Sequence, residues 1–351
     1  MKRHTRIFLL SCFVFRALCL VFPAQALEYN YGSVGIKLSG EGMLGGADAR
    51  DPDSYAISDF RLRGQANYAA SSGWTLGAVY SIDQISAEHN YFARDAFAFA
   101  ESPWGRAELG WTESIAAKLG LGLPDVGSLR MNDYPVLYNI ANPDVPLISN
   151  PTVSDARYSF RASFASVPTK PWQAGVSVAP WSENFKSATD IGIKYRHSRG
   201  KTKIAMTAGA SYIDSPKSLR ADFFAPRVTA DLRAELAAGL NIQYNSWIIG
   251  MNARGIYDRN PIGAPSDGMR LGAGVSYDFI KFSASASYIF SDTGIWHDSR
   301  FTVHDSRVAH TGVVSLRYKI DEHLDVWTSG GLAASDVFAS PFIAAGLHGK
   351  F

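Results

Sequence analysis

Basic side chains that alternate with small or apolar neighbours are the clearest candidates for chemistry in this sequence. Arg61 and Arg63 lie in a segment, 59–68, whose polar residues share one parity while apolar or small residues share the other. A helix would scatter these charges around its axis, whereas a strand places them all on one face. Fixed charge on one face orients and attracts ions. The positions of this type that we select are Lys37, Arg61, Arg63, Arg94, Arg157 and Arg161.

Other reactive residue types form no recognised constellation. The runs His297–Arg300 and His304–Arg307 both read His-Asp-Ser-Arg, and they could bind a metal ion but imply no fixed ligand geometry. Serine, histidine and aspartate that are adjacent in sequence do not make a catalytic triad, which is a spatial arrangement. Gly120-x-Gly122 lacks the spacing of a phosphate-binding loop. We therefore expect no enzyme activity, no cofactor and no metal site.

The alternation recurs along the whole chain and defines the elements that must position these charges. Short turns such as Asn245-Ser246 alternate with longer loops such as 214–232. An even number of such strands, with short turns at one end and long loops at the other, predicts a transmembrane antiparallel β-barrel of 16 strands. The segments lie near 34–44, 55–70, 74–83, 91–101, 106–111, 156–165, 172–180, 190–197, 202–213, 233–244, 247–257, 269–279, 281–290, 308–320, 324–333 and 341–351.

Aromatic residues mark the ends of these strands. A soluble β-sandwich is the alternative for such a pattern, but it does not need an aromatic residue at nearly every strand end. Rings at both interfaces of a lipid bilayer produce paired girdles. Pairs that flank short turns are Tyr68 and Trp74, Phe164 and Trp172, Tyr244 and Trp247, and Phe279 and Phe282, while Tyr80, Tyr212, Tyr257 and Tyr288 mark the opposite ends.

The first 26 residues have the features of a secretory signal peptide. A basic start precedes an apolar run, Ile7–Phe15, and Ala24-Gln25-Ala26 is a small-x-small cleavage site. Both cysteines of the chain lie in this segment, as do four of its basic residues. Cleavage would turn the formal charge of +2 slightly negative, which removes the compositional support for nucleic-acid binding. The near-zero mean hydropathy also excludes a bundle of membrane helices.

Two further stretches carry a family resemblance. The last alternating segment stops at Phe351, and Ser102–Gly110 reads SPWGRAELG. With the signal peptide and the sixteen segments, residues 27–351 resemble the Gram-negative general porins, particularly alphaproteobacterial members, as a single barrel. The resemblance implies an outer-membrane location among lipid and lipopolysaccharide, a homotrimer, and recognition of the C-terminal strand and Phe351 by the outer-membrane assembly machinery. Outward Gly40, Gly42, Gly64 and Ala66 would permit close subunit approach.

Residues 112–155 break the alternation and contain five prolines. A loop of this length is usually functional. The resemblance implies that it is the third loop of the barrel and folds into the lumen, where its acids face the basic residues across a constriction; an extracellular flap is the alternative. Opposed charges there would create a transverse field that tunes ion preference. The acids are Glu113, Asp125, Asp133 and Asp144.

The favoured function is a water-filled channel for passive diffusion of small hydrophilic solutes and ions. The alternative is a substrate-selective channel, which an aromatic ladder along the lumen would support. The inward positions of this sequence are mostly small or charged. A membrane-embedded hydrolase or an adhesin is a more distant possibility.

Overall fold

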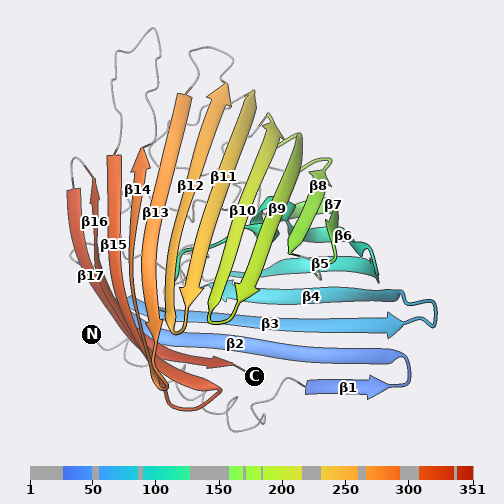
Figure 1. Ribbon diagram of the computed structural model, residues 1–351, viewed down its shortest axis with the longest axis horizontal. Helices are drawn as coiled ribbons and strands as arrows, with labels where there is room; N and C mark the ends of the chain where they lie inside the picture. Colours follow the sequence, from blue (N-terminus) through green and yellow to red (C-terminus); the bar gives the residue numbers. More distant parts are fainter. Residues whose placement is uncertain are drawn as a thin grey trace.

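The computed structural model describes residues 27–49, 55–85, 90–126, 158–168, 171–182, 185–215, 231–259, 266–292, 308–335 and 338–350. Strands make up nearly all of this part of the chain (Figure 1). The strands are β1 (Leu27–Tyr31), β2 (Val34–Ala49), β3 (Tyr55–Ala69), β4 (Thr75–Ile85), β5 (Asn90–Ser102), β6 (Gly105–Glu113), β7 (Tyr158–Ser166), β8 (Trp172–Ala179), β9 (Ser187–Arg199), β10 (Thr202–Asp214), β11 (Leu232–Tyr244), β12 (Trp247–Arg259), β13 (Ser266–Asp278), β14 (Phe282–Asp292), β15 (Val308–Lys319), β16 (Leu324–Ser335) and β17 (Phe338–Lys350). The helix α2 (Ile115–Leu119) follows β6.

The strands β2 to β17 form one closed antiparallel barrel. Each strand pairs with the next in sequence, and β17 returns to pair with β2 from Phe342↔Ala49 to Lys350↔Glu41. The closed sheet therefore has the sixteen strands that the alternating pattern predicts. No helix in the described part of the chain is both long and apolar enough to cross a bilayer.

The strand β1 is an addition that the alternating pattern did not reveal. It pairs with β2 from Leu27↔Leu38 to Tyr31↔Val34, whereas β17 pairs with the same edge of β2 up to Lys350↔Glu41. The strand β1 thus continues the line of β17 along the same edge of β2, as Figure 1 shows near the end of β17. Its five residues do alternate, with Leu27, Tyr29 and Tyr31 on one parity, but all five are exposed and the run is too short to stand out from sequence.

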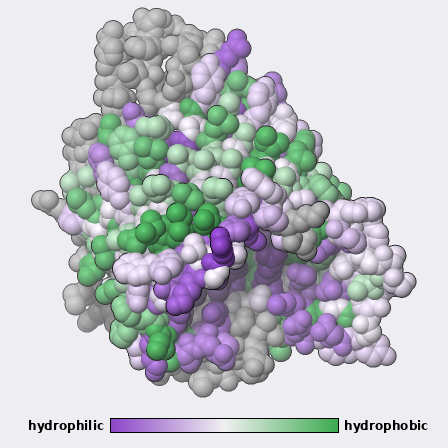
Figure 2. All heavy atoms as spheres, in the orientation of Figure 1, coloured by the Kyte–Doolittle hydropathy of each residue, from purple (hydrophilic) through white to green (hydrophobic). Residues whose placement is uncertain are grey.

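The two faces of the barrel differ as strand alternation requires. On β9, Ile191 and Ile193 point outward with 55% and 40% of their surface exposed, while Asp190 and Lys194 on the other parity are buried. Exposed apolar side chains on the outside and buried polar ones inside are the reverse of a soluble core, and they suit a barrel surrounded by lipid. Figure 2 shows apolar side chains spread over the strands and hydrophilic ones around a hollow in the lower middle of the view.

The short turns lie at one end of the barrel, bordered by the predicted aromatic girdle. The ring centroids of Trp172 and Tyr195 lie 4.7 Å apart, and those of Phe282 and Tyr318 lie 4.8 Å apart. Tyr212 and Tyr257 lie two residues from the opposite ends of β10 and β12 and are 52% and 40% exposed, whereas Tyr80 and Tyr288 lie nearer the middle of β4 and β14. Two of the turns need a left-handed backbone, which Gly200 (φ 58°) and Asn245 (φ 52°) supply. The girdle prediction is confirmed at the end with the short turns, and at the opposite end for Tyr212 and Tyr257 only.

One seam of the barrel has a short ladder. In the described residues β7 and β8 share four residue pairs, from Ala162↔Val178 to Ala165↔Gly175. By comparison, β10 and β11 pair over thirteen. The inner side of this seam carries the helix α2, which contacts β7, β8, β9 and β10.

Candidate functional site

The chain leaves the wall at the end of β6 through a capped helical turn. The Ser114 hydroxyl accepts a hydrogen bond from the Ala117 N–H at 3.2 Å, which satisfies one of the free donors at the start of α2. Ile115, Ala116 and Leu119 are buried against the inner wall. The chain then continues without helix or strand from Gly120 to Val126.

A row of inward glycines accommodates this stretch, one on each strand from β8 to β12 and two on β13. An added Cβ at Gly175 would lie 2.6 Å from Ile115 Cγ1, and one at Gly192 would lie 3.3 Å from Leu119 Cδ1. Such distances leave no room for a side chain between wall and segment. We call this row the glycine track; its members are Gly175, Gly192, Gly209, Gly239, Gly250, Gly272 and Gly274, which face Ile115, Leu119, Ala116, Leu121, Pro124, Leu123 and Pro124 respectively.

Hydrogen bonds attach the same stretch to the wall at both ends. The Ile115 N–H donates to Ser177 Oγ on β8 at 3.1 Å, and the Val126 N–H donates to Ser285 Oγ on β14 at 3.0 Å. Ser285 Oγ also donates to Asp125 Oδ1 at 3.1 Å. Residues 114–126, which we call the wall segment, therefore lie along the polar inner face from β8 to β14.

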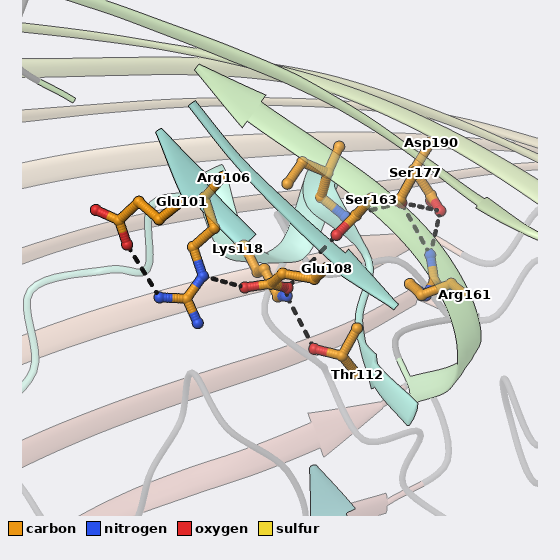
Figure 3. A network of polar contacts seen from close by, with 10 residues as sticks. Glu101, Arg106, Glu108, Thr112, Lys118, Arg161, Ser163, Ser177 and Asp190 are labelled. Carbon is orange, nitrogen blue, oxygen red and sulfur yellow. Dashed lines mark hydrogen bonds and ion pairs between the residues drawn. The ribbon is translucent and has the colours of Figure 1, made fainter. Parts of the chain in front are cut away.

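A charged network holds α2 against β6 (Figure 3). Lys118 donates to the Glu108 carboxylate and, at 2.8 Å, to Thr112 Oγ1. Arg106 Nε donates to Glu108 Oε1 at 2.9 Å, and its guanidinium lies 3.8 Å from the centre of the Phe99 ring. Glu108 thus joins a cation of the wall to a cation of the helix.

A second network crosses the seam between β7 and β8. Arg161 on β7 pairs with Asp190 on β9 at 2.6 Å, and both side chains are fully buried. Arg161 also donates to Ser177 Oγ at 3.0 Å, while Ser211 Oγ donates to Asp190 Oδ1 at 2.6 Å. Burial of two charges is tolerated because each has an opposite charge and further hydrogen bonds. Figure 3 shows Arg161, Ser177 and Asp190 of β7, β8 and β9, and Ser211 extends the network to β10.

A third network runs along the wall from β2 to β4. Arg61 donates to Glu41 Oε1 at 2.8 Å and to Asp83 Oδ1 at 3.1 Å. Glu41 also lies 3.9 Å from His348 on β17, whose other ring nitrogen is 3.3 Å from Asp325 Oδ2. Acidic and basic groups therefore alternate along the inner face from β16 to β4.

An inner wall lined by fixed charges, crossed by a segment of its own chain, is the architecture of a pore. The family model described as "Gram-negative porin" matches residues 24–335. The chain belongs to the Gram-negative porin family. It is an outer-membrane channel for passive diffusion. No curated protein matches this porin by sequence.

Solved structures share the fold of this porin at low sequence identity. An anion-selective porin of Comamonas acidovorans has a TM-score of 0.66 at 10% identity over 91% of this chain and 100% of its own. OmpT of Vibrio cholerae in its trimer form has a TM-score of 0.66 at 11% identity, over 91% of this chain and 100% of its own. The outer membrane channel DcaP of Acinetobacter baumannii has a TM-score of 0.66 at 11% identity, over 93% of this chain and 100% of its own.

The structure of the porin places the predicted basic residues in different environments. Arg61 and Arg161 form the ion pairs given above, whereas Lys37 and Arg63 are exposed. Arg63 acts electrostatically on Asp95 of β5. The side chain of Arg94 and the whole of Arg157 lie outside the described residues.

The predicted loop acids of the porin are separated. Glu113 acts electrostatically on both Arg161 and Asp95, so it lies among the wall charges at the start of the wall segment. Asp125 lies across the barrel beside Ser285. Asp133, Asp144 and Phe351 are outside the described residues, as are residues 1–26 and the rest of the loop from 127 to 155, so the inward path of that part stays a prediction.

Sequence reasoning missed the carboxylates that hold the wall arginines of this porin. Parity places Asp190 on the inner face of β9 together with Gly192 and Lys194. It does not show that Asp190, or Glu41 on β2, is the partner of an arginine on another strand. The glycine track gave a weaker signal, because inward glycines occur elsewhere in the barrel. Among the described residues no group of three or more His, Cys, Asp or Glu could hold a metal ion. The His-Asp runs at 297–307 lie outside them.

Proposed function

We propose that this porin is a general diffusion pore whose ion preference is set by the charges of β2 to β7 and the acids of residues 112–155. The observation that supports the proposal is the electrostatic interaction of Glu113, at the start of the wall segment, with Arg161 and Asp95, and of Asp95 with Arg63. Charges of both signs at one level of a water-filled lumen produce a field across it, which orients dipolar solutes without a binding site.

The solution-facing cations are expected to dominate this preference. Arg61 and Arg161 have carboxylate partners on neighbouring strands, and an ion pair has little net charge at a distance. Lys37 and Arg63 are exposed, so their charge acts on passing ions. The basic wall of Lys37, Arg61, Arg63, Arg94, Arg157 and Arg161 is therefore proposed to act mainly through its exposed members.

Reversal potentials in a salt gradient test this assignment. Arg63→Gln should shift the reversal potential toward cation preference, because it removes a positive charge from the lumen. Arg259→Gln is the matched control, since Arg259 is exposed at the end of β12 on the outward parity. An unchanged potential in Arg63→Gln, or an equal shift in the control, would overturn the role of the basic wall.

Size-graded diffusion distinguishes the general pore from a substrate-selective one. The inward aromatic side chains Phe97, Phe99, Trp327 and Phe342 are buried in the wall, which favours the general pore over an exposed aromatic ladder. Liposome swelling should fall smoothly with sugar size and should not saturate. Saturation by one sugar would favour the substrate-selective channel.

The remaining partners are proposed on the same basis. A homotrimer is supported by small outward residues on adjacent strands, since Gly64 has no atom within 4 Å of an added Cβ except the Tyr80 carbonyl oxygen at 4.0 Å. Signal cleavage near Ala26 and delivery by the assembly machinery through Phe351 complete the proposal. Light scattering of the purified protein tests the trimer, and a monomer mass would refute it. Mass spectrometry of its N-terminus tests the cleavage.

A further inference from the structure

The hairpin that joins β9 to β10 concentrates positive charge at the end of the barrel with the short turns. Within residues 194–203 stand Lys194, Arg196, His197, Arg199, Lys201 and Lys203. Alternation of exposure on β9 ends at Tyr195, and the next four residues are exposed on both faces. The hairpin tip therefore emerges from the wall into water.

The outward column of β9 changes character with depth. Ile191 and Ile193 come first, then Tyr195 in the aromatic girdle beside Trp172, and then His197 and Arg199. The rings of Tyr195 and His197 are parallel within 6°. Arg199 lies four residues past the girdle, about 13 Å along the strand or about 10 Å in depth for a tilted strand. Aliphatic, aromatic and cationic groups thus follow the order of acyl chains, interface and headgroups.

Within the described residues, the tip of β9 has a backbone partner on one side. The ladder between β8 and β9 begins at Trp172↔Tyr195, and the last tie to that side is the Arg196 N–H to the Pro171 carbonyl at 2.7 Å. Residues 197–199 pair only with β10 in the described part of the chain, from Ile204↔His197 to Thr202↔Arg199. Because the side chains of His197 and Arg199 are exposed on the outer face, a headgroup can reach them.

No acidic residue neutralises this hairpin from its own or the adjacent short-turn end. Residues 191–213 contain no Asp or Glu, and neither do residues 236–257, which form most of β11 and β12. Two other short turns differ: Asp278 borders the β13–β14 turn, and Asp321 and Glu322 lie in the β15–β16 turn. The end of the barrel with the short turns is thus positive at β9–β10, whereas the β13–β14 and β15–β16 turns carry charges of both signs.

We propose that His197, Arg199 and Lys201 bind the headgroup of an anionic phospholipid, such as phosphatidylglycerol, in the periplasmic leaflet of the outer membrane. The phosphate lies at the level of His197 and Arg199, and the acyl chains lie against Ile191 and Ile193. Lys201, in the turn after Gly200, supplies a second permanent charge. The outward aliphatic column distinguishes a lipid from a soluble anion as the occupant.

Lipid retention on the purified native protein tests the proposal. Native mass spectrometry should show phosphatidylglycerol retained in preference to phosphatidylethanolamine with the same acyl chains. The double variant Arg199→Gln/Lys201→Gln should lose this preference, by about fivefold for each charge removed. Lys281→Gln/Lys319→Gln, which removes two cations near the β13–β14 and β15–β16 turns, is the matched control. It should retain phosphatidylglycerol with the same preference as the native chain.

Two further measurements keep the test decisive. The preference of the unaltered protein should weaken from about 0.15 M to about 1 M salt, because screening shortens the reach of exposed charges; a salt-independent preference would overturn the proposal even if the double variant failed to fold. Retention by the folded double variant equal to the native chain would also overturn it. Competition by soluble glycerol phosphate as strong as by the lipid would show a phosphate site and refute the lipid as occupant.

Discussion

The glycine track makes the width of the pore sensitive to a single methyl-bearing side chain on the wall. At Gly192 on β9 an added Cβ would lie 3.2 Å from the Ile115 carbonyl oxygen and 3.3 Å from Leu119 Cδ1. Valine suits a strand, but its methyl groups extend about 1.5 Å beyond Cβ. Ordinary contact then requires the wall segment to move by about 1.5–2 Å. Because the wall blocks the other direction, the segment must move toward the pore axis.

We therefore expect Gly192→Val to lower single-channel conductance and the size limit for sugars, at a cost of about 1–3 kcal/mol from overpacking. Gly192→Ala, which needs a shift of only a few tenths of an ångström, should lower conductance less. Gly255→Val on β12 is the matched control, because nothing lies within 4 Å of its added Cβ. Planar-bilayer recordings and liposome swelling measure the effect, and unfolding in urea measures the cost.

The reasoning fails if a folded Gly192→Val channel conducts like the native one. It also fails if Gly255→Val lowers conductance equally, because the effect would then come from adding valine to any strand. A rise in conductance would show that the wall segment detaches rather than shifts inward.

Three further predictions follow from the wall contacts and turns. Arg161→Met should lower the free energy of unfolding in vesicles by about 3–5 kcal/mol, because Asp190 would stay buried without its partner, whereas Arg161→Met/Asp190→Leu should recover most of this loss; equal losses would refute the pairing argument. Ser285→Ala should cost about 1 kcal/mol and raise open-channel noise by freeing the Val126 N–H, and quiet recordings would contradict it. The backbone N–H groups of His323 and Leu324 lower the pKa of Asp321 from its ordinary value of 3.8. The stability that the Asp321 carboxylate contributes is therefore complete above pH 3.8 and is lost as pH falls through its lower pKa in the folded protein. Hydrogen exchange of these two amides should accelerate only below about pH 4, and a transition near neutral pH would contradict the prediction.

The barrel could be predicted from sequence because strand alternation is a local signal. Each residue between lipid and water must match its face, so the pattern at 59–68 recurs on every strand. The strand β1 escaped because its five alternating residues, Leu27–Tyr31, are too few to stand out directly after the predicted signal peptide. An isolated parity rule also places Arg161 and Arg63 on the same face without distinguishing the buried cation from the exposed one.

The partners of those charges depend on register between strands, which sequence does not give. Asp190 meets Arg161 across β8 because of the stagger of three strands, although the two residues are 29 positions apart. Likewise, the track from Gly175 to Gly274 emerges only when six strands are aligned. Parity assigns a face, whereas register decides which residues on that face meet.

The short ladder between β7 and β8 links permeability to mechanical integrity. Among the described residues, β7 and β8 pair at only four positions, and the Arg161–Asp190 pair, Ser177 and α2 bridge this seam from the lumen side. The helix α2, which belongs to the wall segment inside the lumen, therefore also helps to hold β7 and β8 together. A change selected to admit larger solutes by loosening the wall segment would lower resistance to heat and detergent at the same time. Wider variants of this pore should thus need compensating changes at the seam before they persist in a membrane.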